Sequence, residues 1–126
     1  MIPTDKNDEE AIQKLKSVTD DQVIENADQL LEWLQDSNWP VFKGVVSRLS
    51  GLGNELVVPI NNILKGNDSI WKANIVGHLI PSFSKESQQL YIKSLEKLLA
   101  ELDENDLREG VIDFVEMQLA NSKKCT

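Results

Sequence analysis

The chain has 126 residues, which is long enough for one domain with a sizeable hydrophobic core and too short for two domains of ordinary size. Its composition, with 40% hydrophobic and 27% charged residues, is typical of a soluble globular protein. The net charge of −8 argues against a nucleic-acid backbone as the main partner, because proteins that bind one need clustered Lys and Arg.

The first third of the chain predicts two helices. Apolar residues recur at helical spacing over residues 8–18, with Asn7 or Asp8 as the N-cap. A second capping signal opens the next helix, which covers residues 19–34 and is interrupted near Asn26. Neither segment shows the alternating pattern of a β-strand.

Residues 30–40 predict a tight corner between two helices. An apolar stripe that includes Trp33, a predicted core residue, ends at the polar residues 36–38, whose side-chain oxygens suit helix ends and N-caps. Pro40 is expected in the first turn of the following helix, where its missing N–H costs nothing. Trp39 then places a large aromatic ring at the bend.

The rest of the chain predicts five more helices. Each begins at a polar capping residue or ends at Gly or Pro, and each carries apolar residues three or four positions apart. The expected spans are residues 41–52, 54–66, 68–80, 84–102 and 105–119. The predicted fold class is therefore all-α.

An internal repeat emerges when the chain is compared with itself at an offset of 30 residues. Five apolar positions then coincide: Leu30, Leu34, Val45, Val46 and Leu49 match Ile60, Leu64, Ile75, Val76 and Leu79. A looser third copy follows at a larger offset. Such helix–turn–helix units are typical of repeat proteins, and they predict a short HEAT-like α-solenoid of about three helical hairpins. An irregular helical bundle with chance matches is the alternative.

We expect a single all-helical domain over residues 8–120, between a flexible leader at 1–7 and a flexible tail at 121–126. The one cysteine, Cys125, lies in that tail, so neither a disulfide nor a Cys-based metal site is expected. The amino terminus lacks the apolar run of a secretory signal, and no segment approaches the ~20 apolar residues of a membrane span. The predicted location is the cytoplasm, with no membrane partner.

No catalytic or metal-binding motif is present in the sequence. His78 is the only histidine, and it has no sequence-adjacent partner for acid–base chemistry. The glycines of residues 50–53 follow no strand and precede no Lys-Ser/Thr pair, so they predict a helix terminator rather than a phosphate loop. The acids of residues 103–106 lack the Gly and the final Glu of a calcium loop. We therefore predict no enzyme, no metal and no cofactor.

Two tryptophan corners are the best candidates for binding. Trp39 and Trp71 each lie near the start of the second helix of a repeat, among polar residues, and an aromatic ring with a polar rim is the composition of a binding hot spot. The predicted partner-binding set is Asp36, Asn38, Trp39, Asp68, Trp71 and Lys72. The alternative is that both rings pack between repeats, that the first corner's polar side chains cap helix ends, and that Asp68 pairs with Lys72 one turn later.

The same corners resemble a known family. The run Trp-Leu-Gln-Asp-Ser-Asn-Trp-Pro (33–40) and the later Asp-Ser-Ile-Trp-Lys (68–72) are similar to a family of small bacterial proteins described as domain of unknown function 5071. The resemblance covers residues 6–116. It implies a HEAT-like helical fold and no established activity.

The leading functional hypothesis is a non-enzymatic interaction module that presents a groove to a protein partner. Its rival is an enzyme or small-ligand binder with a polar pocket at the repeat corners, formed by Asp36, Asp68, Lys72 and His78. By analogy with other small acidic bacterial proteins, a toxin-neutralising immunity-type role is a weaker alternative.

Overall fold

The computed structural model describes residues 2–123, and every regular element in this range is helical, as predicted. None of the helices described is both long and apolar enough to cross a membrane. The α-helices are α1 (Glu9–Leu15), α2 (Asp20–Glu25), α3 (Ala27–Leu31), α4 (Phe42–Leu49), α5 (Val57–Leu64), α6 (Ser69–Asn74), α7 (Lys85–Gln89), α8 (Ile92–Ala100), α9 (Glu104–Arg108) and α10 (Val111–Lys123). Three shorter elements are η1 (3-10, Glu32–Leu34), η2 (π, Ile75–Leu79) and η3 (3-10, Ile80–Ser82).

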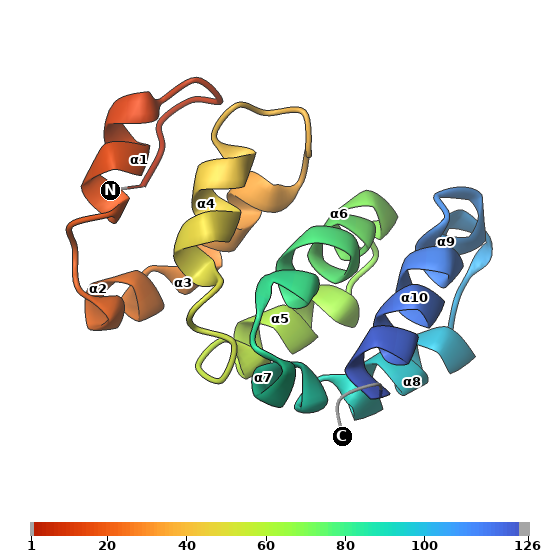
Figure 1. Ribbon diagram of the computed structural model, residues 1–126. Helices are drawn as coiled ribbons and strands as arrows, with labels where there is room; N and C mark the ends of the chain where they lie inside the picture. Colours follow the sequence, from red (N-terminus) through yellow and green to blue (C-terminus); the bar gives the residue numbers. More distant parts are fainter. Residues whose placement is uncertain (1, 124–126) are drawn as a thin grey trace.

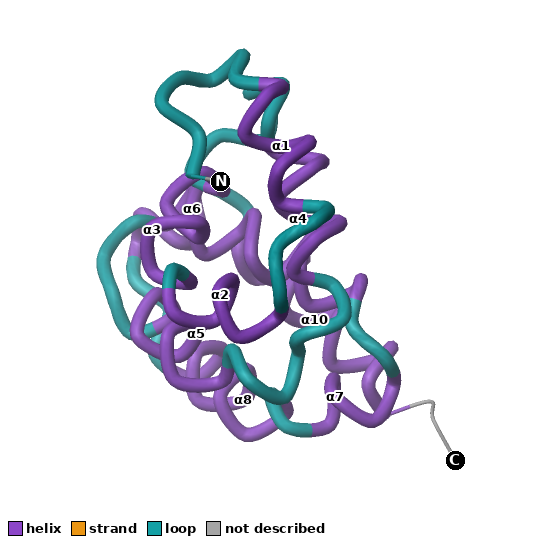
Figure 2. The backbone as a smooth tube through the Cα atoms, turned by 90° about the vertical axis from the view of Figure 1, so that its left-hand side faces the viewer, coloured by secondary structure: helices purple, strands orange, loops and turns teal. Residues whose placement is uncertain are grey.

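The helices lie in two rows (Figures 1 and 2). One row contains α1, α4, η2 and α10, in which each element contacts the next. The other row contains α3, α5 and α8, with α6 packed on α5 and continuing into η2. One continuous cluster of buried apolar side chains, from Leu15 to Leu119 along the sequence, joins the two rows. Burial of this surface supplies the main driving force for folding.

Local capping signals identify four helix starts correctly. The Asp8, Thr19, Asp68 and Ser84 side chains each accept a hydrogen bond from a backbone N–H in the first turn of the helix that follows. The predicted interruption at Asn26 is also confirmed, because α2 ends there and α3 begins at the next residue.

Two predicted caps are wrong. Helix α4 begins at Phe42 and α5 at Val57, and neither N-cap residue makes a side-chain hydrogen bond. Pro40 therefore precedes the first turn of α4, and Asn38 and Asn54 do not cap these helices. At the first corner the polar residues instead form a turn, because the Asp36 carboxylate accepts a hydrogen bond from the Asn38 N–H at 2.8 Å.

The predicted long helix over residues 84–102 is divided into α7 and α8. Between them, the Tyr91 ring is fully buried, stacks on Phe83 and donates its hydroxyl hydrogen bond to the Gly53 carbonyl at 2.6 Å. Since Gly53 precedes α5, this hydrogen bond holds the junction between α7 and α8 against the segment that leads into α5. Burial also raises the pKa of the Tyr91 hydroxyl, so the group stays protonated and remains a donor.

The ends of two other predicted helices also differ from the structure. The last helix does not start at Asn105: Asp103 caps the short α9, and Gly110, with φ of 75°, lets the chain turn into α10. The α-helix that Asp68 caps is shorter than predicted: α6 ends at Asn74, and the π-helix η2 and the 3-10 helix η3 follow it, with Pro81 in the first turn of η3, where a missing N–H is tolerated.

The chain ends were predicted to be flexible, a prediction that remains untested. Within the leader, Pro3 is buried and the Lys6 carbonyl accepts a hydrogen bond from the Val41 N–H at 3.1 Å. At the other end, α10 extends to Lys123 and Ser122 is buried. Residues 124–126, which include Cys125, lie outside the described residues.

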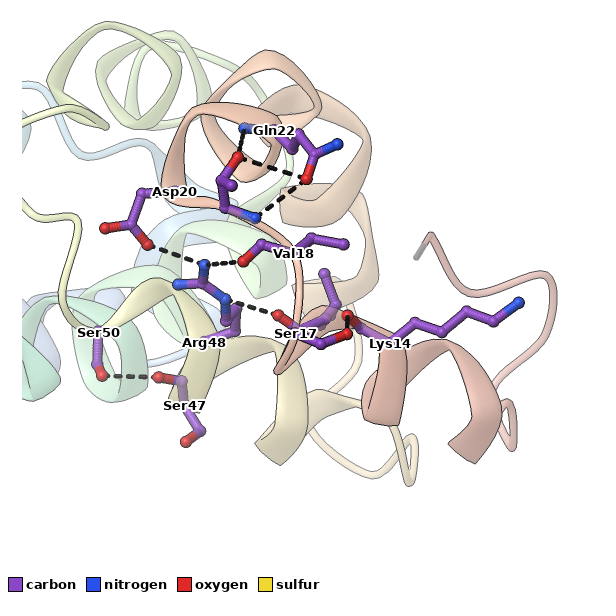
Figure 3. A network of polar contacts seen from close by, with 10 residues as sticks. Lys14, Ser17, Val18, Asp20, Gln22, Ser47, Arg48 and Ser50 are labelled. Carbon is purple, nitrogen blue, oxygen red and sulfur yellow. Dashed lines mark hydrogen bonds and ion pairs between the residues drawn. The ribbon is translucent and has the colours of Figure 1, made fainter.

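Arg48 of α4 ties the α1–α2 connection to the rest of the fold (Figure 3). Its guanidinium donates hydrogen bonds to the carbonyls of Leu15 (2.8 Å) and Val18 (3.0 Å) and forms an ion pair with Asp20 at 2.8 Å. Leu15 is the last residue of α1, where carbonyls lack intrahelical partners. The Arg48 side chain thus pairs with the carbonyl of the last residue of α1 and with the carboxylate of the first residue of α2.

Replacing Arg48 with Met is expected to lower the free energy of unfolding by about 1–3 kcal/mol, because the bonds to two carbonyls are lost while most of the aliphatic stem remains. Urea unfolding of the full chain measures the change. Lys43→Met, at an exposed position on the same helix, is the matched control. Equal stability of the two variants would contradict this role for Arg48.

Candidate functional site

The first tryptophan corner is partly buried. Trp39 packs edge-on against Trp33, with ring centroids 5.4 Å apart. Both residues are half-buried, and Trp33 packs against the core. Trp33 therefore lies at the margin of the core rather than inside it. Asp36 is half-buried and Asn38 is exposed.

The second corner clamps α6 onto the end of the α3–η1 segment. The Asp68 carboxylate caps α6 by accepting a hydrogen bond from the Trp71 N–H at 3.0 Å. The Trp71 indole N–H donates to the Leu31 carbonyl at 2.9 Å, and the Asn74 amide donates to the Leu34 carbonyl at 2.9 Å. Both tryptophan corners thus have a structural role, and the Trp71 ring is held in one orientation.

Lys72 does not pair with Asp68. Its side chain is 4% exposed, and its ammonium forms an ion pair with the Asp106 carboxylate of α9 at 2.8 Å; that carboxylate is 2% exposed. The expected partner is unsuitable because the Asp68 carboxylate already caps the helix and is exposed. Sequence reasoning missed Asp106, although Lys72 lies at helical spacing with the core residues Ile75, Val76 and Leu79, a position that requires a partner for its charge.

Asp106 is held by several donors. Besides Lys72, its carboxylate accepts hydrogen bonds from the Ser69 hydroxyl at 2.5 Å and from the Asp103 N–H at 3.1 Å. Burial raises the pKa of Asp106, but the hydrogen bonds from Lys72, Ser69 and Asp103 outweigh it and hold the pKa below the ordinary value of 3.8. The carboxylate is therefore ionised at neutral pH.

This lowered pKa predicts a pH-dependent contribution to stability. Because the folded-state pKa lies below the unfolded-state value, the contribution is complete above pH 3.8 and is lost as the pH falls through the folded-state pKa. The difference in unfolding free energy between the wild type and Asp106→Asn should thus be constant near neutral pH and shrink in acid. Urea titrations from pH 7 to about pH 2 measure it. A difference that grows in acid would contradict the assignment.

A cavity of about 170 Å³ lies beside this ion pair. The buried Oδ1 of Asn61, one of the lining residues, accepts no hydrogen bond from the part of the chain that the structure describes. An unsatisfied buried acceptor costs about 1–3 kcal/mol. The cavity is lined by residues of α5, α6, α8, α9 and the adjoining loops: Asn61, Leu64, Lys65, Gly66, Asn67, Lys72, Ser94, Lys97, Leu98, Glu101, Asp103 and Asp106.

A separate groove of about 370 Å³ runs between α3–η1 and the α5–α6 corner, and we call it the Trp71 groove. Its apolar residues are buried or half-buried, whereas its carboxylates and amides are exposed. The lining residues are Asp28, Leu31, Glu32, Pro59, Asn62, Ile63, Gly66, Asn67, Asp68 and Trp71. Gly66 and Asn67 line both this groove and the cavity.

The four residues of the predicted polar pocket are not brought together. Lys72 lines the cavity, Asp68 lines the Trp71 groove, and Asp36 belongs to the first corner. His78 is exposed on η2 and lines a different small pocket, with its ring centroid 5.2 Å from that of Phe42. Within residues 2–123, no three His, Cys, Asp or Glu side chains are grouped to hold a metal ion.

The comparison with known proteins supports the resemblance noted in the sequence. No curated protein matches the chain. The family described as a domain of unknown function (DUF5071) matches residues 1–119, a span that includes both tryptophan corners, the Trp71 groove and the Lys72–Asp106 ion pair. The chain therefore belongs to the DUF5071 family.

Proposed function

We propose that this protein is a non-enzymatic protein–protein interaction module built as a short HEAT-like α-solenoid. The three hairpins of the proposed solenoid are α3 with α4, α5 with α6, and α8 with α10. The two-row arrangement supports this proposal, as does the burial of the residues that the 30-residue offset matches, such as Leu30 with Ile60 and Leu49 with Leu79. Stacked helical hairpins offer extended surfaces for partners.

The Trp71 groove is the proposed binding surface, and a basic segment of a protein partner is its proposed occupant. Asp28, Glu32 and Asp68 contribute three exposed carboxylates, while no Lys or Arg occurs among the described residues that line the groove. This acidic rim around Trp71 is the observation that carries the proposal. Charge complementarity selects a basic partner, and a cation beside a tryptophan ring gains further attraction.

The groove suits a Lys or Arg side chain in two further ways. Its apolar lining, which includes Leu31, Pro59 and Ile63, can cover the aliphatic stem of such a side chain while the charged group meets the carboxylates. The Trp71 ring is already fixed by its hydrogen bond to Leu31, so binding does not have to order it.

Two of the six predicted contact residues, Asp68 and Trp71, line the proposed surface. Asp36, Asn38 and Trp39 belong to the other corner, and Lys72 is buried in its ion pair. The proposal therefore concentrates partner binding on the second corner and gives the first corner a role in the fold.

Selection of peptides from a random display library on the immobilised full chain tests the proposed function. We expect the selected peptides to be enriched in Lys and Arg, and to be lost when selection is repeated on the charge-reversed variant Asp28→Lys/Glu32→Lys. Selected peptides that are neutral or acidic, or that bind both proteins equally, would overturn the proposal, as would the absence of any selected sequence.

A further inference from the structure

We propose that a second copy of this chain is a partner for the Trp71 groove and that it docks there through α4. The inference rests on the function proposed for the groove, because it names a source for the basic segment. Its basis is an exposed edge of α4, formed by Lys43 and Ser47, which we call the α4 ridge.

The α4 ridge stands between two hollows. A groove of about 660 Å³ lies between α4 and α1, and a smaller hollow of about 200 Å³ lies between α4 and η2. These two elements are the neighbours of α4 on either side in its row (Figure 1). Lys43 and Ser47, one helical turn apart, line both hollows and are exposed. They therefore form the outer edge of α4.

The two hollows contain basic residues and no acidic ones. Lys16 at the end of α1, Lys43 and Arg48 line the larger hollow, whereas no Asp or Glu occurs among the described residues that line either one. The charge of Arg48 is matched by Asp20, but within residues 2–123 neither Lys16 nor Lys43 forms an ion pair. In a chain with 21 acidic and 13 basic residues, this surface has the opposite sign to the whole. Two lysines are thus available to carboxylates of another molecule.

The α4 ridge and the Trp71 groove complement each other. The groove has the exposed carboxylates of Asp28, Glu32 and Asp68 and no Lys or Arg among its described lining residues. Helices commonly pack by placing a ridge of side chains into a groove. The aliphatic stem of Lys43 can lie on the apolar lining of the groove while its ammonium meets the carboxylates. The chain therefore carries both a basic ridge and an acidic groove that can receive it.

The ridge and the groove lie on different sides of the fold. In Figure 2, α1 and α4 are on the right, whereas α3, α5 and α6, which line the groove, are on the left. The groove shares no lining residue with the two hollows beside α4. One copy can therefore offer its ridge to one neighbour and its groove to another. Such a head-to-tail contact produces either a ring or an open chain of copies.

Sedimentation velocity of the full chain at physiological salt, where distant like charges are screened, tests this inference. We expect the weight-average mass to rise above that of the monomer as the concentration increases from about 20 µM to about 1 mM. Lys16→Glu/Lys43→Glu reverses the charge of the ridge, and Asp28→Lys/Glu32→Lys reverses that of the groove. Each should weaken self-association by about tenfold or more. A wild-type chain that stays monomeric at the highest concentration would overturn the inference.

Mixing the two variants locates the contact. Lys16→Glu/Lys43→Glu keeps an intact groove and Asp28→Lys/Glu32→Lys keeps an intact ridge, so an equimolar mixture should associate although neither variant does so alone. The Trp71 indole N–H of the first variant, labelled with ¹⁵N, should shift when the unlabelled second variant is added. Failure of the mixture to associate, or association without a shift of Trp71, would overturn the inference.

A matched control distinguishes the ridge from the net charge of the protein. Lys93→Glu/Lys97→Glu makes the same change of net charge at exposed positions of α8, outside the groove and both hollows. Its self-association should stay within about threefold of the wild type. A loss equal to that of the ridge variant would overturn the inference.

Failure of this inference can be distinguished from failure of the proposed function. A chain that remains monomeric but selects Lys/Arg-rich peptides would overturn the inference and leave the function proposed for the Trp71 groove intact. A chain that neither associates nor selects such peptides would overturn both.

Discussion

Replacing Lys72 with Met is expected to lower the free energy of unfolding by about 3–5 kcal/mol, because the Asp106 carboxylate is left buried without its counter-charge. This is a large part of the stability of a domain of this size. Urea or thermal unfolding of the full chain measures the loss. Lys97→Met, which alters an exposed lysine at the rim of the same cavity, should change stability by about 0.5 kcal/mol or less.

A double-mutant cycle separates the ion pair from other effects of the substitution. In Lys72→Met/Asp106→Asn the buried charges disappear together, while an amide oxygen remains to accept from the Ser69 hydroxyl. We expect the double variant to be more stable than the sum of the two single losses implies, by about 1–3 kcal/mol. Strictly additive losses would contradict a direct interaction between the two side chains.

Charge reversal in the Trp71 groove is expected to weaken the binding of a Lys/Arg-rich peptide by about 100-fold. Asp28→Lys/Glu32→Lys replaces two attractive contacts with repulsive ones at exposed positions of α3 and η1. Fluorescence anisotropy with a labelled peptide from the selection measures the affinity. Raising the salt concentration should weaken binding to the wild type, because these charges are screened.

A matched control variant distinguishes the effect of charges inside the groove from the effect of the protein's net charge. Asp21→Lys/Glu25→Lys makes the same change of net charge at exposed positions of α2, outside the groove. Its effect on affinity should be less than about threefold at physiological salt, where distant surface charges are largely screened. An equal loss of affinity in both double variants would show that only the net charge matters.

The features that sequence reasoning predicted correctly depend on neighbours in the chain. The caps at Asp8, Thr19, Asp68 and Ser84 each involve a backbone group only three residues away, so the residue type and the following apolar pattern are sufficient. The break between α7 and α8 could not be predicted in this way. It depends on a bond from Tyr91 to Gly53, which lies 38 residues earlier.

In the candidate site, too, the features set by nearby residues could be predicted and those set by distant residues could not. The cap at Asp68 and the position of Trp71 at a corner follow from local sequence, but the partner of Lys72 is 34 residues away, on a helix whose start was misplaced. A sequence gives no measure of the space left between helices. The cavity and the Trp71 groove, each lined by several elements, could therefore be found only in the structure.

The most direct test of the proposed interaction surface is the response of the three tryptophan indole N–H signals to a bound peptide. The full chain is labelled with ¹⁵N and titrated with a Lys/Arg-rich peptide from the selection, with Trp33 and Trp39 serving as internal controls at the first corner. We predict that the Trp71 signal shifts progressively and saturates, while those of Trp33 and Trp39 stay in place. Shifts of Trp33 and Trp39 with no change at Trp71 would contradict the proposal and would assign partner binding to the first corner.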